Sequence, residues 1–179
     1  IYFPYGSPPL TKQFYGLLLN YFFGLRAYGL ALSFRCIDGT STTVADFAYE
    51  SYYDGVDGYR DRVQENLYLW VGAGVSPVWG YENYTLLNTV ATSGSKVFPF
   101  SLSYNSSHAI FTVTASCVLT SSANITEVGF VIQSIDINDD ITDSGPNRKN
   151  VLILYFVLDN PVYVESGGAF KFRCEIVLP

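Results

Sequence analysis

The last strand of the chain is the feature that most constrains its fold. Between Phe170 and Leu178 apolar side chains alternate with charged ones, and Lys171, Arg173 and Glu175 occupy the charged face. A period of two residues is typical of a strand that buries one face in an antiparallel sheet. Such a face needs a second layer to cover it, and the rest of the chain has to supply that layer.

Three further strands are predicted upstream of the last one. Residues 111–119 alternate in the same way, and residues 125–132 follow a predicted turn at residues 120–124. Residues 151–158 are apolar on both faces, which is typical of a central strand that is covered on both sides. The C-terminal third is therefore expected to be a run of short strands.

A hairpin is predicted to close this run. Residues 161–164 read as a strand, and the turn at residues 165–168 contains two glycines, which readily adopt the positive φ of tight turns. The strand that starts at Phe170 would then pair with residues 161–164. Strands at this spacing predict a mainly β fold, an antiparallel β-sandwich or jelly roll.

The chain opens with an aromatic arm, residues 1–9, interrupted by three prolines. A free tail of this composition is poorly soluble in water, so its rings are expected to be buried. They could pack on their own domain or dock in the groove of a neighbouring subunit by strand addition.

A helix is predicted at residues 10–24, with Ser7 as its N-cap and Pro8 in the first turn. Lys12 and other polar residues leave an apolar run shorter than the roughly 20 residues that cross a bilayer, so no membrane span is expected. A helix packed on the sheets or on another subunit is favoured. The residues expected to contact other subunits are Ile1, Tyr2, Phe3, Tyr5, Phe14, Tyr21 and Phe22.

The middle of the chain contains a predicted surface loop, residues 40–66, which is rich in Tyr, Gly and acidic residues. It lies between predicted strands at residues 30–37 and 67–71. Long loops on rigid scaffolds often carry recognition residues, although a solvated loop packed on its own tyrosines explains the composition as well. The tyrosines proposed for recognition are Tyr49, Tyr52, Tyr53 and Tyr59.

The size and charge of the chain restrict its class. Its 179 residues predict one domain, residues 10–179, behind the arm. A net charge of -6 repels phosphate backbones, so no nucleic-acid partner is expected. The three cysteines Cys36, Cys117 and Cys174 allow at most one internal disulfide, and buried free thiols are the simpler interpretation.

Few residues suggest chemistry. The one histidine, His108, stands at a predicted strand edge without a nucleophile motif, so neither an enzyme nor a cofactor is expected. Asp136, Asn138 and Asp140 resemble the opening of a calcium loop, but Ile141 replaces the glycine of that pattern, and an ordinary acidic loop is favoured. The glycosylation pattern occurs at three positions: Asn83, Asn105 and Asn124.

Two C-terminal motifs carry a resemblance to a known group of proteins. Residues 125–130 (ITEVGF) and 158–168 (LDNPVYVESGG), followed by the alternating last strand, are similar to the closing half of a β-sandwich in virion surface and tail proteins of bacteriophages and archaeal viruses. Residues 10–14 and the glycine loop at residues 71–74 resemble other parts of these proteins more weakly.

The resemblance covers most of the chain and implies a structural or attachment role. Residues 40–66 have no counterpart in it, and the loop at residues 136–150 is long. The expected function is that of a non-enzymatic virion component in a capsid decoration, spike or tail. Its expected partners are copies of itself, other virion proteins, and a host-surface receptor or glycan.

Two alternatives remain open. A secreted archaeal pilus or thread subunit, located at the cell surface, would polymerise by donating residues 1–5 as a strand to its neighbour. A carbohydrate-binding module would instead present exposed aromatic platforms, for which Trp70 and Trp79 are the candidates.

Overall fold

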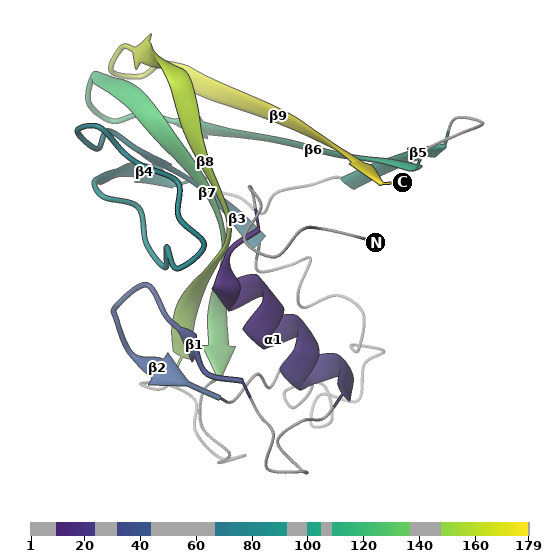
Figure 1. Ribbon diagram of the computed structural model, residues 1–179. Helices are drawn as coiled ribbons and strands as arrows, with labels where there is room; N and C mark the ends of the chain where they lie inside the picture. Colours follow the sequence, from purple (N-terminus) through teal and green to yellow (C-terminus); the bar gives the residue numbers. More distant parts are fainter. Residues whose placement is uncertain are drawn as a thin grey trace, which may run out of the picture.

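The computed structural model shows a mainly β protein with antiparallel sheets and one short helix near the N-terminus (Figure 1). Two sheets dominate the described part of the chain, and a small two-stranded sheet lies beside the helix. The residues that the structure describes are 10–23, 32–43, 67–92, 100–104, 109–136 and 148–178.

The larger sheet has four antiparallel strands in the order β4-β3-β7-β8. Its registers place Phe130 of β7 opposite Leu69 of β3 on one side and Leu154 of β8 on the other. All three side chains are buried, and residues 127–132 of β7 are buried on both faces of the sheet. The strands are β3 (Leu67–Gly72), β4 (Thr89–Thr92), β7 (Ala123–Asp136) and β8 (Arg148–Val164).

The second sheet has three antiparallel strands in the order β5-β6-β9. In β9, Phe170 is buried and Phe172 half-buried, whereas Lys171 and Arg173 are exposed, so the predicted alternation is confirmed there. The predicted hairpin is wrong, because β8 pairs with β7 whereas β9 pairs with β6. The strands are β5 (Phe100–Tyr104), β6 (Ala109–Val118) and β9 (Ala169–Leu178).

The two sheets meet at a corner, where two connections cross side by side from one sheet to the other. Residues 119–122 join β6 to β7, and residues 165–168 join β8 to β9. Figure 1 shows the sheets diverging from this corner, with β6 and β9 running away from β7 and β8. Asn124, predicted to lie in a turn, is the second residue of β7, so the predicted turn ends earlier than expected.

A shared apolar core joins the two sheets near the corner. Phe172 of β9 packs against Phe156 and Phe130, with ring centroids 5.0 and 5.7 Å apart respectively. The same cluster includes Cys117 of β6 and Leu119, which directly follows that strand, and both are almost fully buried. Burial of these side chains, rather than backbone pairing, therefore holds one sheet to the other.

The prediction for residues 151–158 is half correct. Both faces of this part of β8 are covered, since residues 151–155 are all buried. However, β8 is the edge strand of its sheet and not a central strand. Leu10 forms an isolated bridge to Leu154, and the backbone N–H groups of Thr11 and Ile37 bond the carbonyls of Ile153 and Asn150. These contacts cover the first half of its outer edge.

Helix α1 (Lys12–Phe23) confirms the predicted helix, but it begins later than the predicted cap at Ser7, which lies outside the described residues. Thr11 caps it instead: its hydroxyl accepts a bond from the Phe14 N–H at 3.4 Å and donates one to the Leu152 carbonyl at 2.8 Å. Among the described helices, none is long and apolar enough to cross a membrane.

A small sheet beside the helix contains β1 (Phe34–Arg35) and β2 (Ser41–Thr42). Phe34 and Cys36 are buried and Arg35 is exposed, so the alternation predicted here is confirmed, although the paired strand is shorter than expected. The buried Gln13 side chain ties α1 to this sheet, because its carbonyl accepts the Arg35 N–H at 2.6 Å.

Candidate functional site

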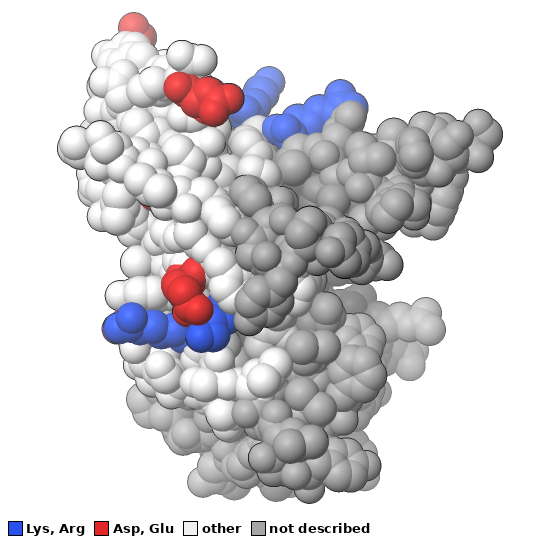
Figure 2. Space-filling model, viewed as in Figure 1, with Lys and Arg blue, Asp and Glu red and all other residues white. Residues whose placement is uncertain are grey.

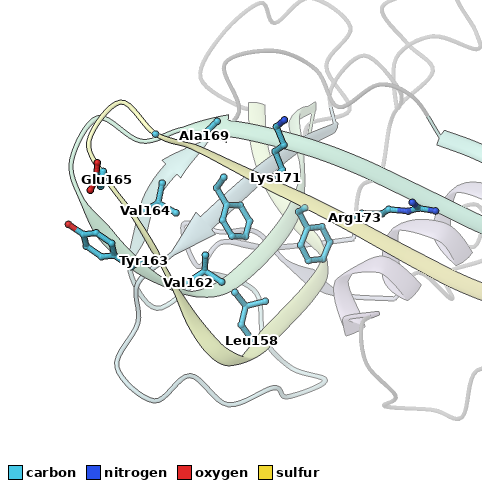
Figure 3. Close-up of a pocket in the computed structure, with 11 residues that line it drawn as sticks. Leu158, Val162, Tyr163, Val164, Glu165, Ala169, Lys171 and Arg173 are labelled. Carbon is cyan, nitrogen blue, oxygen red and sulfur yellow. The ribbon is translucent and has the colours of Figure 1, made fainter.

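An apolar groove lies on the open side of the corner, between the end of β8 and the start of β9 (Figure 3). Its volume is about 530 Å³, within the roughly 300–1,000 Å³ typical of ligand pockets. We call it the corner groove. Its lining residues are Leu158, Val162, Tyr163, Val164, Glu165, Gly168, Ala169, Phe170, Lys171, Phe172 and Arg173.

A bulge in β8 opens this groove. Glu127 faces Val157 and Ile125 faces Val162, so the four residues 158–161 of β8 stand against the single residue Thr126 of β7. Pro161 lies within this extra segment, where the N–H that proline lacks is not needed for the ladder. Beyond the bulge, β8 resumes pairing with β7 up to Val164, and residues 165–168 then lead into β9 of the other sheet.

The corner itself is held by hydrogen bonds between its two connections. Leu119 exchanges two backbone bonds with residues of the other turn, donating to Gly168 at 3.0 Å and accepting from Gly167 at 2.7 Å. The Ser166 hydroxyl donates to the Thr120 carbonyl at 2.9 Å. Gly167 has a φ of +77°, which favours glycine at this position. These hydrogen bonds fix the position of the two connections that border the groove.

The groove is apolar inside and carries charged side chains of both signs at its rim, namely Glu165, Lys171 and Arg173. Val162 is 44% and Tyr163 61% exposed, so large apolar side chains remain in contact with water. Lys171 and Arg173 alternate with the phenylalanines of β9 and are exposed. Figure 2 shows that the charged side chains on this face form two groups, one beside the corner and one near the start of α1.

A second cluster, which was not predicted as a site, surrounds the buried carboxylate of Glu127 on β7. Its Oε2 accepts the Leu87 N–H at 3.1 Å and the Tyr155 hydroxyl at 2.8 Å, and its Oε1 accepts the Asn88 N–H at 3.1 Å. Glu127 and Tyr155 have no measurable exposure. Burial, followed by the neighbouring Glu127 carboxylate, raises the pKa of Tyr155.

The glycine loop makes room for this carboxylate. A Cβ at Gly72 would lie 2.5 Å from Glu127 Oε1, and one at Gly74 would lie 2.8 Å from the same atom. Thr126 Oγ1 donates to the Gly74 carbonyl at 2.9 Å. Residues 71–74 and 125–130, the two motifs similar to parts of virion proteins, are thus adjacent in space. Since each carboxylate oxygen is bonded, the cluster fastens residues 73–88 to the sheet.

The predicted subunit-contact residues are only partly described. Ile1, Tyr2, Phe3 and Tyr5 lie outside the described residues. Phe14 is half-buried and packs on the core of its own chain. Tyr21 and Phe22 belong to α1, and their side chains are not described.

Most of the other predicted site residues lie outside the described part of the chain. The recognition tyrosines Tyr49, Tyr52, Tyr53 and Tyr59 lie outside the described residues, as do His108, Asn105, Asn138 and Asp140. Asp136 ends β7 opposite Arg148, and within the described residues no three metal-binding side chains gather. Asn124 is exposed and Asn83 half-buried.

Two cysteines and two tryptophans have clear positions. Cys36 and Cys117 are buried free thiols, which agrees with the simpler of the two interpretations for Cys117, and burial raises the pKa of each to about 11. Cys174 lies in β9, and its side chain is not described. Trp70 and Trp79 are half-buried against the cluster around Tyr155, with both indole N–H groups buried, which does not suit the exposed platforms of a carbohydrate-binding module.

Comparison with known proteins adds no relative. No protein-family model matches the chain, and no curated protein or solved structure is similar to it. The resemblance to virion proteins therefore stays a prediction, and the corner groove is the main basis for a functional proposal.

Proposed function

We propose that this chain is a non-enzymatic structural subunit of a virus particle, in which the two sheets close as a β-sandwich and the corner groove contacts a neighbouring subunit. The observation that carries the proposal is the groove itself. It is an apolar hollow between two sheet edges, with Val162 and Tyr163 left partly in water.

Apolar exposure at this position favours association. Each Å² of apolar surface removed from water contributes roughly 25 cal/mol, and aromatic side chains such as Tyr163 are common at the centres of interfaces. The groove also lies beside the outer edges of two strands, β8 and β9. Within the described residues, the second half of β8 and the outer edge of β9 pair with no further strand. Free edges of this kind accept an added strand.

The charge pattern favours a protein partner over nucleic acid. The chain carries a net charge of -6, which opposes binding to phosphate backbones. Lys171 and Arg173 at the groove rim form a local positive strip on this acidic protein. With the acidic Glu165 at the same groove, these charges would orient a partner surface of complementary charge.

A single substitution in the groove tests the proposal. We expect Val162→Asp to keep the fold, because this side chain is 44% exposed, and to abolish incorporation into particles purified from the native source. The matched control is Val118→Asp, which alters an exposed valine on β6 outside the groove lining. Circular dichroism checks the fold, and mass spectrometry of purified particles measures incorporation. Equal incorporation of both variants would contradict the proposed groove contact.

A filament subunit is the second candidate, favoured by the position of β8 and β9 as outermost strands of their sheets among the described residues. It would polymerise through donated strands rather than decorate a closed particle. Electron microscopy of the native source discriminates between the two, because threads made of this chain alone would replace the virion assignment.

A further inference from the structure

We infer that the corner groove receives residues 1–7 of a second copy of this chain. This inference rests on the proposed function, because it names the partner of the same groove. The donated segment would lie extended beside the end of β8, with its apolar side chains in the groove.

The chemistry of the segment matches the groove. Residues 1–7 (IYFPYGS) carry no charged side chain, and four of the seven are large and apolar or aromatic. The groove offers Leu158, Val162 and Phe172 as an apolar lining. Pro4 is tolerated in a segment added at a sheet edge, where one N–H of every two points away from the ladder.

The structure also places the origin of the segment close to the groove. Leu10, the first described residue, forms an antiparallel bridge to Leu154 of β8. From Leu154 to Leu158, where the groove lining begins, the strand advances about 13 Å at ~3.3 Å per residue. Leu10 therefore lies beside the same strand whose second half lines the groove.

Two features disfavour docking of the arm on its own β8. The Thr11 N–H bonds the Ile153 carbonyl, and in this antiparallel register the nitrogen of residue 9 would face the Tyr155 carbonyl. Residue 9 is proline, which has no N–H to donate. The bulge at residues 158–161 then breaks the regular edge. Regular backbone pairing between the arm and its own β8 would therefore be interrupted twice. These interruptions favour docking of the arm in the groove of a neighbouring subunit.

Complementation between two full-length variants tests the inference. The arm variant Phe3→Asp/Tyr5→Asp keeps an intact groove, and the groove variant Val162→Asp keeps an intact arm. Native mass spectrometry is expected to show oligomers for the wild type and the Val118→Asp control, and monomers for each variant alone. An equimolar mixture is expected to give a heterodimer, because one intact arm meets one intact groove.

A synthetic peptide of residues 1–7 gives a second measurement. Fluorescence anisotropy is expected to show the peptide binding to the arm variant and at least tenfold more weakly to its Val162→Asp derivative. A peptide with Asp at positions 3 and 5 is the control. Tyr163→Ser, at a side chain that is 61% exposed, serves as a second groove substitution that leaves the core untouched.

The outcomes separate this inference from the proposed function. The inference is overturned if the mixture of the two variants stays monomeric, or if the peptide binds equally well with and without the Val162→Asp substitution. Assembly of the arm variant like the wild type, with the groove variant still defective, overturns the inference and leaves the groove contact standing. Wild-type assembly of the groove variant, both in solution and in particles, overturns both.

Discussion

The hydroxyl of Tyr155 donates a 2.8 Å hydrogen bond to the carboxylate of Glu127, and both side chains are shielded from water. The two residues lie on adjacent strands, β7 and β8, 28 positions apart in the chain. Together with the N–H groups of Leu87 and Asn88, the hydroxyl satisfies a charge that would be costly to bury alone.

Replacing Glu127 with Gln is expected to lower the free energy of unfolding by about 2–3 kcal/mol. An amide has one acceptor oxygen instead of two, so at least one buried donor loses its partner. Urea unfolding followed by circular dichroism measures the change. Glu165→Gln, at an exposed turn position, is the control and should change the value by less than ~0.5 kcal/mol. Equal effects of both variants would show that Glu127 does not fasten the loop.

Tyr155→Phe is expected to lower the free energy of unfolding by about 1.5–3 kcal/mol at pH 7, because it removes a bond to a charged group. The cost should shrink above pH 10. The folded pKa of Tyr155 is raised above its usual 10.0, so the unfolded chain ionises first and wild-type stability falls with rising pH. The slope is about 1.4 kcal/mol per pH unit for one proton.

This pH dependence is measured as the difference between wild type and Tyr155→Phe at pH 8, 10 and 11. The thiols of Cys36 and Cys117, whose pKa is about 11, titrate in both proteins, and their contribution cancels in the difference. A difference that stays constant over this range speaks against a buried, bonded tyrosine at position 155.

Gly72→Ala is expected to destabilise the protein by about 1–3 kcal/mol through overpacking, since the added carbon would lie 2.5 Å from Glu127 Oε1. In a Glu127→Ala background the same change should cost much less, because the clashing atoms are gone. A double-mutant cycle on unfolding free energies measures this coupling. Additive effects would mean that Gly72 is needed for another reason.

Cys36 and Cys117 are expected to resist alkylation in the native protein at pH 7.5. Both thiols are buried, and their raised pKa keeps them protonated, whereas the thiolate is the reactive form. Iodoacetamide labelling followed by mass spectrometry checks this, with the urea-unfolded chain as the control that labels fully. Rapid labelling of either residue before unfolding would place that thiol at the surface.

Much of the secondary structure was predictable, because a strand with one buried face shows alternating apolar and polar residues in its sequence. The alternation from Phe170 to Arg173 identifies the buried face of β9, and the glycines at residues 167–168 mark the turn before it. The same pattern misassigned the hairpin. Alternation reports which face of a strand is buried and carries no information on which strand lies beside it.

The Glu127 cluster could not be predicted for a related reason. Its donors come from Leu87 and Asn88, about forty positions earlier, and from Tyr155, and no local pattern links them. The glutamate stands within an apolar run, which was the only available signal that its side chain points inward.

The sequence by itself determined most of the strand segments of the C-terminal half and their apolar faces, because steric and hydrophobic preferences act over a few residues. Only the tertiary structure decided that β8 and β9 belong to different sheets, that their divergence opens a groove beside Val162, and that Glu127 is buried with three donors. Those features depend on hydrogen bonds and packing between distant segments, whose pairing no short stretch encodes.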